Sequence, residues 1–373
     1  MHRLPGGSVP LRSQIPSMTR ASHTAARPSA LLQFSILGYV GIVLVASLYP
    51  FTGGRVPEMP WLVTQFTEWP RYYTYTDMVM NVMAYLPFGL LLTLWLGMRM
   101  RMMPAASYAV VTAALFSLLV EVVQAGMPTR VPSGLDVFCN ATGALIGAWI
   151  TLLSGTRPRG AGPVARWRAQ AIIPGAAGDA MIVLLVLWVV MQFKPDHWLF
   201  ALGDVRHLSL SPDHPSLPDG YRTFEMAVAA AGTAALAGAV GFVTPGRRWP
   251  WFALLLLSGL VLRSLASLLF FRTGTLVQWM TPGNLAGLAL GLLLAAGILR
   301  QGIRVAGLAG VAATVILAML VNAAPTAELA HPLPVELWRQ SHLRSVAGAA
   351  QALAVLWPAL AVWTTLTART FAR

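Results

Sequence analysis

The stretch EVVQAGMPTRVPSGLDVFCN, residues 121–140, spans the junction between two long apolar segments, residues 105–126 and 135–154. An apolar segment of about 20 residues can cross the hydrocarbon core of a bilayer as one helix. The turn GMPTRVPSG joins the two segments, so the sequence predicts two consecutive transmembrane helices that run in opposite directions. The same stretch concentrates acidic, amide and guanidinium side chains, which an apolar chain must accommodate at a defined place.

The composition of the whole chain indicates further transmembrane helices. Of its 373 residues, 56% are hydrophobic and 10% are charged, whereas soluble domains carry about 25% charged residues. The deficit is spread along the chain, so we predict an all-α fold, a polytopic transmembrane helical bundle. About ten spans are expected, at about residues 31–50, 77–97, 105–126, 135–154, 177–193, 224–244, 249–271, 277–298, 304–322 and 345–366.

The basic residues predict how the bundle is oriented. The chain has 26 Lys and Arg residues against 13 Asp and Glu residues. If the N-terminus is cytoplasmic, 16 of the basic residues fall in cytoplasmic segments and nine in outer loops, and Arg263 lies inside a span. This bias follows the positive-inside rule. We therefore expect a multi-pass protein of the bacterial inner (cytoplasmic) membrane with both termini in the cytoplasm, and the charge needs no nucleic-acid partner.

The N-terminus and the few ligand-type side chains set further bounds. Residues 1–30 are rich in Pro, Ser and Arg, and they are predicted to form a disordered basic cytoplasmic tail. The first apolar segment is expected to be a membrane anchor, because Leu44 spoils an A-x-A cleavage signal at Ala46. The single Cys139 excludes an internal disulfide and a Cys-based zinc site. The histidines His197, His207 and His214 are too loosely spaced to indicate a metal site. No metal ligands are therefore assigned, and whether a cofactor binds stays open.

A weak internal repeat suggests how the spans are grouped. NATGALIG, beginning at Asn140, and NLAGLALG, beginning at Asn284, share an Asn-x2-Gly-x3-Gly spacing at the start of a span. A four-helix unit at residues 31–155 would then have a degenerate partner at 177–298, followed by two helices at 304–366. Glu225 roughly parallels Asp77, but the second unit has no match for the other acids, so its chemistry is expected in the first. Close helix packing is expected at Gly143, Gly147, Gly287 and Gly291.

Polar side chains should meet at the outer ends of the second, third and fourth spans. Each helix contributes a pair at i,i+3 or i,i+4 spacing, which places both members on one helix face. A charge in the bilayer costs about 3 kcal/mol unless it is paired or hydrated, so these faces should turn inward. The three carboxylates and one guanidinium leave a formal charge of −2, which favours a raised pKa or a bound cation. The predicted pocket comprises Asp77, Asn81, Glu121, Gln124, Arg130, Asp136 and Asn140.

Helix capping is a competing explanation for part of this pocket. Asp77 and Asp136 occupy first helical turns, where a carboxylate interacts favourably with the positive end of the helix dipole. Glu121 lies near the C-terminus of its helix, where that account does not apply. Arg130 could simply neutralise a neighbouring acid. A structural polar plug therefore stays open as an alternative to a functional site.

The polar motifs resemble those of the VanZ-like family of bacterial integral membrane proteins. The similarity rests on SLYPF at residues 47–51, on DMVMNVMAYLPFG at residues 77–89, and on the spacing E-x2-Q-x5-R-x5-D-x3-N-x2-G-x3-G at residues 121–147. It covers about residues 40–150. The family is associated with low-level resistance to the glycopeptide teicoplanin, and the resemblance implies no defined biochemical activity. It therefore indicates a membrane unit of the cell envelope and leaves the reaction undetermined.

Three functions remain in competition at this point. The first is binding or processing of a membrane lipid or a lipid-linked cell-envelope precursor, in which the acids hold a divalent cation, Arg130 meets an anionic oxygen and one acid acts as a general base. Whether the protein is an enzyme stays open, because the cluster contains no Ser/His pair, no HExxH motif and no His. The second is a proton- or cation-coupled transporter. The third is a non-catalytic structural or assembly protein. The oligomeric state is not predicted.

Overall fold

The computed structural model describes residues 30–49, 51, 54, 56, 59–68, 73–128, 130–155, 163–194, 197–205, 220–270, 276–324 and 341–368. The basic tail predicted at residues 1–30 lies outside these residues except at Ala30. The described part is helical and contains no strand, which confirms the all-α prediction. The helices are α1 (Leu31–Leu48), α2 (Met59–Thr67), α3 (Tyr75–Gly97), α4 (Met102–Gln124), α5 (Gly134–Leu153), α6 (Pro163–Ala171), α7 (Ala176–Met191), α8 (Tyr221–Val243), α9 (Arg248–Phe270), α10 (Pro282–Leu299), α11 (Ile303–Ala323) and α12 (Ser341–Leu366).

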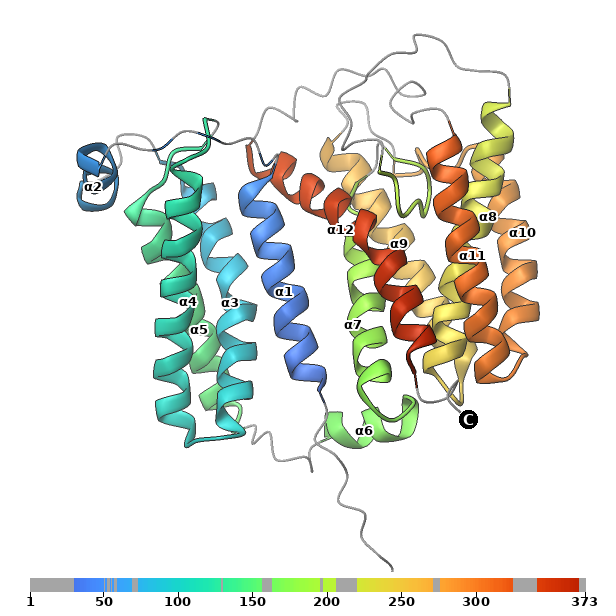
Figure 1. Cartoon of the computed structure of the whole chain (residues 1–373), viewed down its shortest axis with the longest axis horizontal. Coiled ribbons are helices and arrows are strands. Elements are labelled where there is room, and N and C mark those ends of the chain that lie inside the picture. Colours follow the sequence, from blue (N-terminus) through green and yellow to red (C-terminus); the bar gives the residue numbers. More distant parts are fainter. Residues whose placement is uncertain are drawn as a thin grey trace, which may run out of the picture.

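Nine of these helices are long and apolar enough to cross a membrane, among the described residues. They correspond to nine of the ten expected spans, and the fifth expected span is the shorter helix α7, with 16 residues. At 1.5 Å per residue α7 is about 24 Å long, which is less than the hydrocarbon thickness of about 30 Å. The short helices α2 and α6 lie at opposite ends of the bundle, as Figure 1 shows.

A buried non-helical segment, residues 197–205, follows α7. Its residues from Trp198 to Asp204 are all buried, and Phe200 packs against Trp188 of α7 with ring centroids 5.1 Å apart. Non-helical backbone is tolerated at membrane depth only where the protein buries and satisfies it. Helix α12 provides one such hydrogen-bond partner. Its Pro358 has no N–H, so the carbonyl four residues earlier in the helix lacks its usual donor. The Gly203 N–H donates to that carbonyl, Ala354 O, at 2.8 Å.

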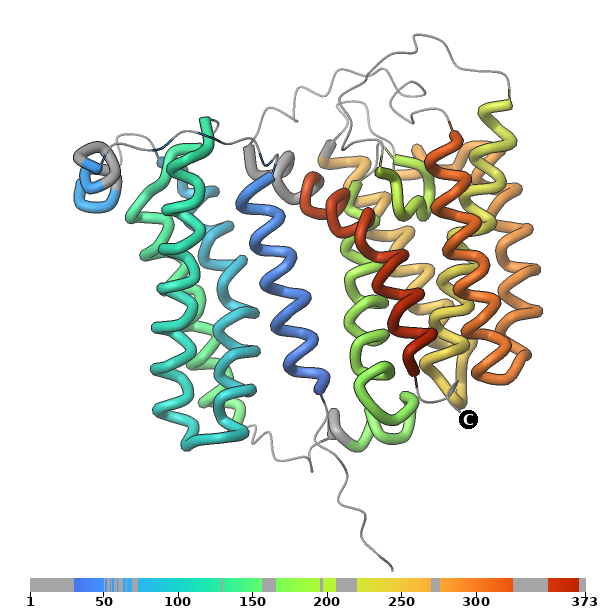
Figure 2. Tube along the Cα trace, viewed as in Figure 1, coloured from blue at the N-terminus to red at the C-terminus, as the bar shows by residue number. Residues whose placement is uncertain are grey.

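The helices form two groups that meet along α1, α7 and α12. In the tube view of Figure 2 and in Figure 1, α3, α4 and α5 stand on one side and α8, α10 and α11 on the other. Each group has its own hydrophobic core, centred on Phe88 in the first and on α8 in the second. Helix α8 is buried at every residue from Val228 to Val243. This is possible because its sequence is mostly Ala and Gly, which lets neighbouring helices approach closely.

One close contact of the α3–α5 pair recurs at the same spacing in the α8–α10 pair. A Cβ added to Gly143 would lie 2.2 Å from Val82 O, and one added to Gly287 would lie 2.5 Å from Met226 O. Gly143 lies 144 residues before Gly287, and Val82 lies 144 residues before Met226. In this register Glu225 matches Asn81, not Asp77 as the sequence suggested. The same step relates Asn140 to Asn284.

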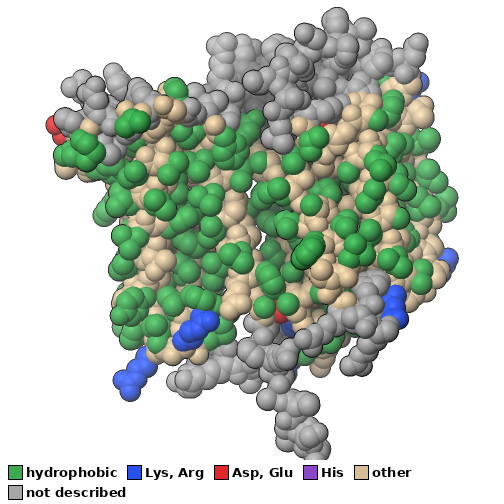
Figure 3. Space-filling model, viewed as in Figure 1, with side chains coloured by type: hydrophobic (Ala, Val, Ile, Leu, Met, Phe, Trp, Pro, Cys, Tyr) green, Lys and Arg blue, Asp and Glu red, His purple; other side chains and the backbone are tan. Residues whose placement is uncertain are grey.

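Basic residues gather at one end of the bundle. The connections α3–α4, α8–α9 and α10–α11 and helix α6 lie at the lower end in Figure 1, which is also the end at which α12 finishes. These connections and α6 carry Arg99, Arg101, Arg166, Arg168, Arg247, Arg248, Arg300 and Arg304. Figure 3 shows blue side chains at this end of the visible face and green, hydrophobic ones along the helices. The distribution agrees with a multi-pass membrane protein whose charged connections lie outside the bilayer.

Candidate functional site

The predicted pocket residues lie at the end of the bundle opposite to the basic connections. Helix α3 begins there after its N-cap Thr74, α4 ends there at Gln124, and α5 begins there after its N-cap Ser133. Alternating helix direction therefore places these three helix ends side by side, at the upper end of Figure 1. Asp77 and Asn81 lie in the first turns of α3, and Glu121 and Gln124 in the last turns of α4. Asp136 and Asn140 lie in the first turns of α5, and Arg130 lies in the turn between α4 and α5.

Two amide side chains join α5 to its neighbours. Asn81 Nδ2 of α3 donates to Asp136 Oδ1 of α5 at 2.8 Å. Asn140 Nδ2 of α5 donates to Ser117 Oγ of α4, also at 2.8 Å, and this bond is buried. Hydrogen bonds between membrane helices contribute about 0.6 kcal/mol on average. The two bonds fix the relative rotation of the three helices more than they stabilise them.

Glu121 is a buried carboxylate that serves the neighbouring helix. Its side chain is 5% exposed, and its Oε2 accepts the backbone N–H of Ser133 at 3.0 Å. Ser133 is the N-cap of α5, so the carboxylate lies at the positive end of the α5 dipole. Asp136 and Arg130 also interact electrostatically with it. The expectation that helix-end electrostatics leave Glu121 unexplained was therefore wrong, because the relevant helix is α5 and not α4.

Helix α1 contacts two of the predicted pocket residues. Gln124 Nε2 donates to Ser47 O at 2.8 Å, and Arg130 donates to Tyr49 O at 3.1 Å. A weaker contact joins Arg130 to Ala46 O at 3.5 Å. These carbonyls belong to the C-terminal end of α1, which lacks helical donors and carries the negative end of the dipole.

This arrangement changes what Arg130 does. Burial lowers the pKa of Arg130, and the nearby Glu121 carboxylate opposes that shift. A guanidinium has so high an intrinsic pKa that it stays charged in proteins. The contacts with α1 give this cation a structural role, in addition to the two roles that the sequence left open, neutralisation of a neighbouring acid and contact with an anionic ligand.

Asp77 occupies the helix-capping position proposed for it. Its backbone N–H donates to Thr74 Oγ1 at 3.1 Å, and it is the acidic residue in the first turn of α3. The side chain is only partly buried. Capping thus accounts for the placement of Asp77, and Asp136 combines the same first-turn position with its bond to Asn81.

The described residues contain no group of three His, Cys, Asp or Glu side chains that could hold a metal ion. The idea that the three acids hold a divalent cation therefore has no geometric support in this part of the chain. A different feature distinguishes the pocket. Asn140 is 6% exposed, and its Oδ1 has no hydrogen-bond partner. Because a serine hydroxyl can donate or accept, either amide orientation leaves one polar atom of Asn140 unsatisfied.

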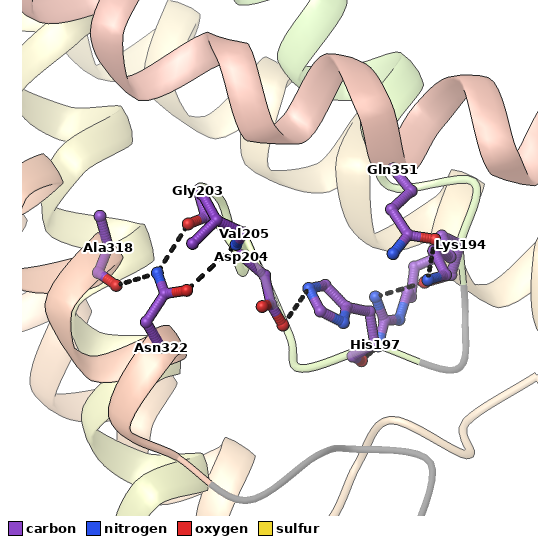
Figure 4. A network of polar contacts seen from close by, with 9 residues as sticks. Lys194, His197, Gly203, Asp204, Val205, Ala318, Asn322 and Gln351 are labelled. Carbon is purple, nitrogen blue, oxygen red and sulfur yellow. Dashed lines mark hydrogen bonds and ion pairs between the residues drawn. The ribbon is translucent and has the colours of Figure 1, made fainter. Parts of the chain in front are cut away.

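Sequence reasoning missed a second set of buried polar residues, at the same end of the other helix group. Figure 4 shows Lys194 directed at Gln351, with 2.7 Å between Nζ and Oε1, and His197 facing Asp204, with 3.8 Å between Nε2 and Oδ2. Arg263 donates to the carbonyls of Lys194 and His197. The signals were available, because Lys194 is the single lysine of the chain and Arg263 lies within an apolar span. His207 and His214 lie outside the described residues.

Comparison with known proteins agrees with the pattern in the first helix group. Residues 25–155 match the family model described as VanZ/LLP1, which covers about a third of the chain. No curated protein and no solved structure matches the chain. The matched region contains α1 to α5 and every residue of the predicted pocket. Residues 25–155 therefore form a VanZ-like region of a multi-pass membrane protein.

Proposed function

We propose that the pocket of the VanZ-like region binds the polar head of a membrane lipid or of a lipid-linked cell-envelope component. The observation that carries the proposal is the buried Asn140 Oδ1, which has no hydrogen-bond partner and lies on α5 one turn from Asp136. Leaving such a group without a partner costs about 1–3 kcal/mol. A ligand group that hydrogen-bonds to Asn140 would recover this free energy.

Hydrogen bonds hold the residues of the proposed site in place, as a binding site requires. Glu121, Gln124 and Arg130 are held by backbone groups of α5 and α1, and Asn81 holds Asp136. None of these bonds needs to break when a ligand reaches Asn140. We propose binding and assign no catalytic residue.

The basic connections support one orientation. They carry eight described arginines and lie at the end opposite to the pocket. By the positive-inside rule that end would face the cytoplasm of a bacterial inner membrane. Both termini would then be cytoplasmic, and the pocket would open toward the outer leaflet and the periplasm. Labelling of single cysteines placed at Arg99 and at Pro128 by an impermeant reagent tests this: only the second should react in intact cells.

Substitution of Asn140 tests the binding proposal. Asn140→Leu keeps the branched side-chain shape but removes the amide oxygen and the amide nitrogen. The full chain would be extracted from its native membrane in polymer-bounded lipid discs, and the retained lipids would be quantified by mass spectrometry. We expect one polar lipid class to be enriched with the wild type and lost with Asn140→Leu. Asn322→Leu, which changes an amide in the other helix group, should leave the enrichment intact.

A structural lock is the second candidate, and the bonds from Gln124 and Arg130 to α1 favour it. In that case no lipid class would be enriched, and Asn140→Leu would change only the free energy of unfolding. A transporter is less well supported, because transporter sites lie near the bilayer midplane and these residues lie at helix ends. Equal lipid profiles for the wild type and Asn140→Leu would refute the binding proposal.

A further inference from the structure

The second helix group has a polar contact at the position that corresponds to the first pocket. In the shared register Asn81 matches Glu225, and Asn140 matches Asn284. The Asn81–Asp136 bond of 2.8 Å joins α3 to α5, and a Thr281–Glu225 bond of 2.8 Å joins α10 to α8, with Thr281 one residue beyond the position that matches Asp136. The acid has changed sides: it lies on α5 in the first group and on α8 in the second. An aligned sequence pattern does not reveal this exchange.

Contacts connect this position to its aromatic neighbours. Thr281 is the N-cap of α10 and accepts the backbone N–H of Asn284, whose Nδ2 donates to Trp279 O at 2.9 Å. Tyr221, one turn before Glu225 on α8, stacks on Trp198 with ring centroids 4.7 Å apart. Glu225 and Tyr221 interact electrostatically. The non-helical segment thus reaches the outer end of the α8–α10 pair through Trp198.

Buried polar atoms of this cluster lack hydrogen-bond partners. They are Asn284 Oδ1, Trp198 Nε1 and Gln278 Oε1. Gln278 precedes Thr281 by three residues. Asn284 is 6% exposed and Trp198 is 3% exposed. The amide orientation of Asn284 is fixed, because its Nδ2 faces a carbonyl, which can only accept. Asn140 has an unsatisfied amide at the equivalent position, so the same feature occurs once in each helix group.

The unsatisfied groups define the ligand chemistry. They are neutral, and they comprise two acceptors and one donor. The charged neighbours are already engaged: Glu225 accepts from Thr281, and Arg263 donates to the carbonyls of Lys194 and His197. A hydroxyl group both donates and accepts, and aromatic rings such as Trp198 and Tyr221 offer apolar faces to the carbon skeleton that carries hydroxyls.

We propose that Asn284, Trp198 and Gln278 form a second ligand site that takes a hydroxyl-rich lipid head group, with Glu225 and Thr281 as its floor. A glycerol head group and a sugar head group both supply this chemistry. The site is distinct from the pocket in residues 25–155, so its failure or success does not depend on that of the first proposal.

Lipid titration with native mass spectrometry tests the second site. The purified full chain would be titrated separately with phosphatidylglycerol, with a monoglucosyl diacylglycerol and with phosphatidylethanolamine. We expect one of the first two to bind more tightly than phosphatidylethanolamine, and which of them binds distinguishes glycerol from sugar. Trp198→Phe keeps the ring on Tyr221 but removes the donor, so it should weaken that binding about tenfold, as expected for one buried hydrogen bond.

Matched variants separate this site from other effects. Trp188 lies in the same helix group, and its buried indole N–H also has no hydrogen-bond partner. Trp188→Phe removes that N–H and should leave lipid affinity unchanged. Asn284→Leu should weaken binding as Trp198→Phe does. Preference for phosphatidylethanolamine, absence of any preference, or equal losses in Trp188→Phe and Trp198→Phe would each overturn the proposal. If Asn284→Leu does not fold, the lipid affinity of Trp198→Phe still tests the proposed site.

Discussion

The crossing of α3 and α5 offers the sharpest test of the fold, through Gly143→Ala. The added Cβ would lie 2.2 Å from Val82 O and 2.9 Å from Val82 C. A carbon and a carbonyl oxygen in close contact are ordinarily about 3.3 Å apart or more, so the two helices would have to separate by about 1 Å. Both neighbouring atoms belong to the backbone of a helix, and a change of side-chain rotamer cannot relieve the clash.

The expected cost follows from two opposing effects. Overpacking of a tight contact costs about 1–3 kcal/mol, and a backbone clash belongs at the upper end. Replacing Gly by Ala in a helix gains up to about 1 kcal/mol. We therefore expect Gly143→Ala to lower the free energy of unfolding by about 2 kcal/mol. Gly41→Ala in α1 is the matched control, because nothing lies within 4 Å of its added Cβ, and it should be neutral or stabilising.

Reversible unfolding in mixed detergent micelles measures both variants. Gly287→Ala, at the corresponding α8–α10 contact, should destabilise in the same direction as Gly143→Ala, since its added Cβ meets Met226 O at 2.5 Å. If Gly143→Ala and Gly41→Ala unfold alike, the helices are not in contact at this crossing, and the shared register would be refuted with it.

Three further substitutions probe individual contacts. Glu121→Leu should lower the free energy of unfolding by about 1–3 kcal/mol, because it removes the acceptor of the Ser133 N–H, whereas Glu121→Gln keeps an acceptor and should cost less. Arg130→Met should expose the connection after α1 to protease without unfolding the bundle, since it frees the Tyr49 carbonyl; unchanged cleavage would argue against this contact. Asn322→Leu removes the bonds to Gly203 O and to the Val205 N–H, and we expect faster hydrogen exchange at residues 203–205, with α3 as the internal reference.

Much of the architecture was predictable because apolar length is a local property. Nine of the predicted spans correspond to helices long enough to cross a membrane. The span around α7 differs because the chain leaves the helix after Met191 and continues as a buried segment. Its stabilising partners, Ala354 and Asn322, lie more than 100 residues away, and no local pattern announces them.

The end of the bundle at which the predicted pocket residues lie was predictable, but their contacts were not. Alternating helix direction was enough to place Asp77, Glu121 and Asp136 at one end of the bundle. The role of α1 was not foreseen, because Gln124 and Arg130 bind its main-chain carbonyls, which carry no sequence signature. The place of Glu225 was misjudged for a related reason: it was compared with Asp77, and only the packing of Gly287 on Met226 corrects that alignment.

The bond between Gly203 and Ala354 has a consequence for the order in which the protein is made. The segment after α7 emerges from the ribosome long before α12, yet its Gly203 N–H finds its acceptor on α12 and its Gly203 carbonyl finds its donor on Asn322 of α11. Until those helices are inserted, this backbone has to remain in contact with water or another partner, because unsatisfied peptide groups are costly in lipid. Helix α12 therefore completes a part of the structure whose other residues precede α8 in the sequence, and a chain that stops before Pro358 should be a substrate for membrane quality control.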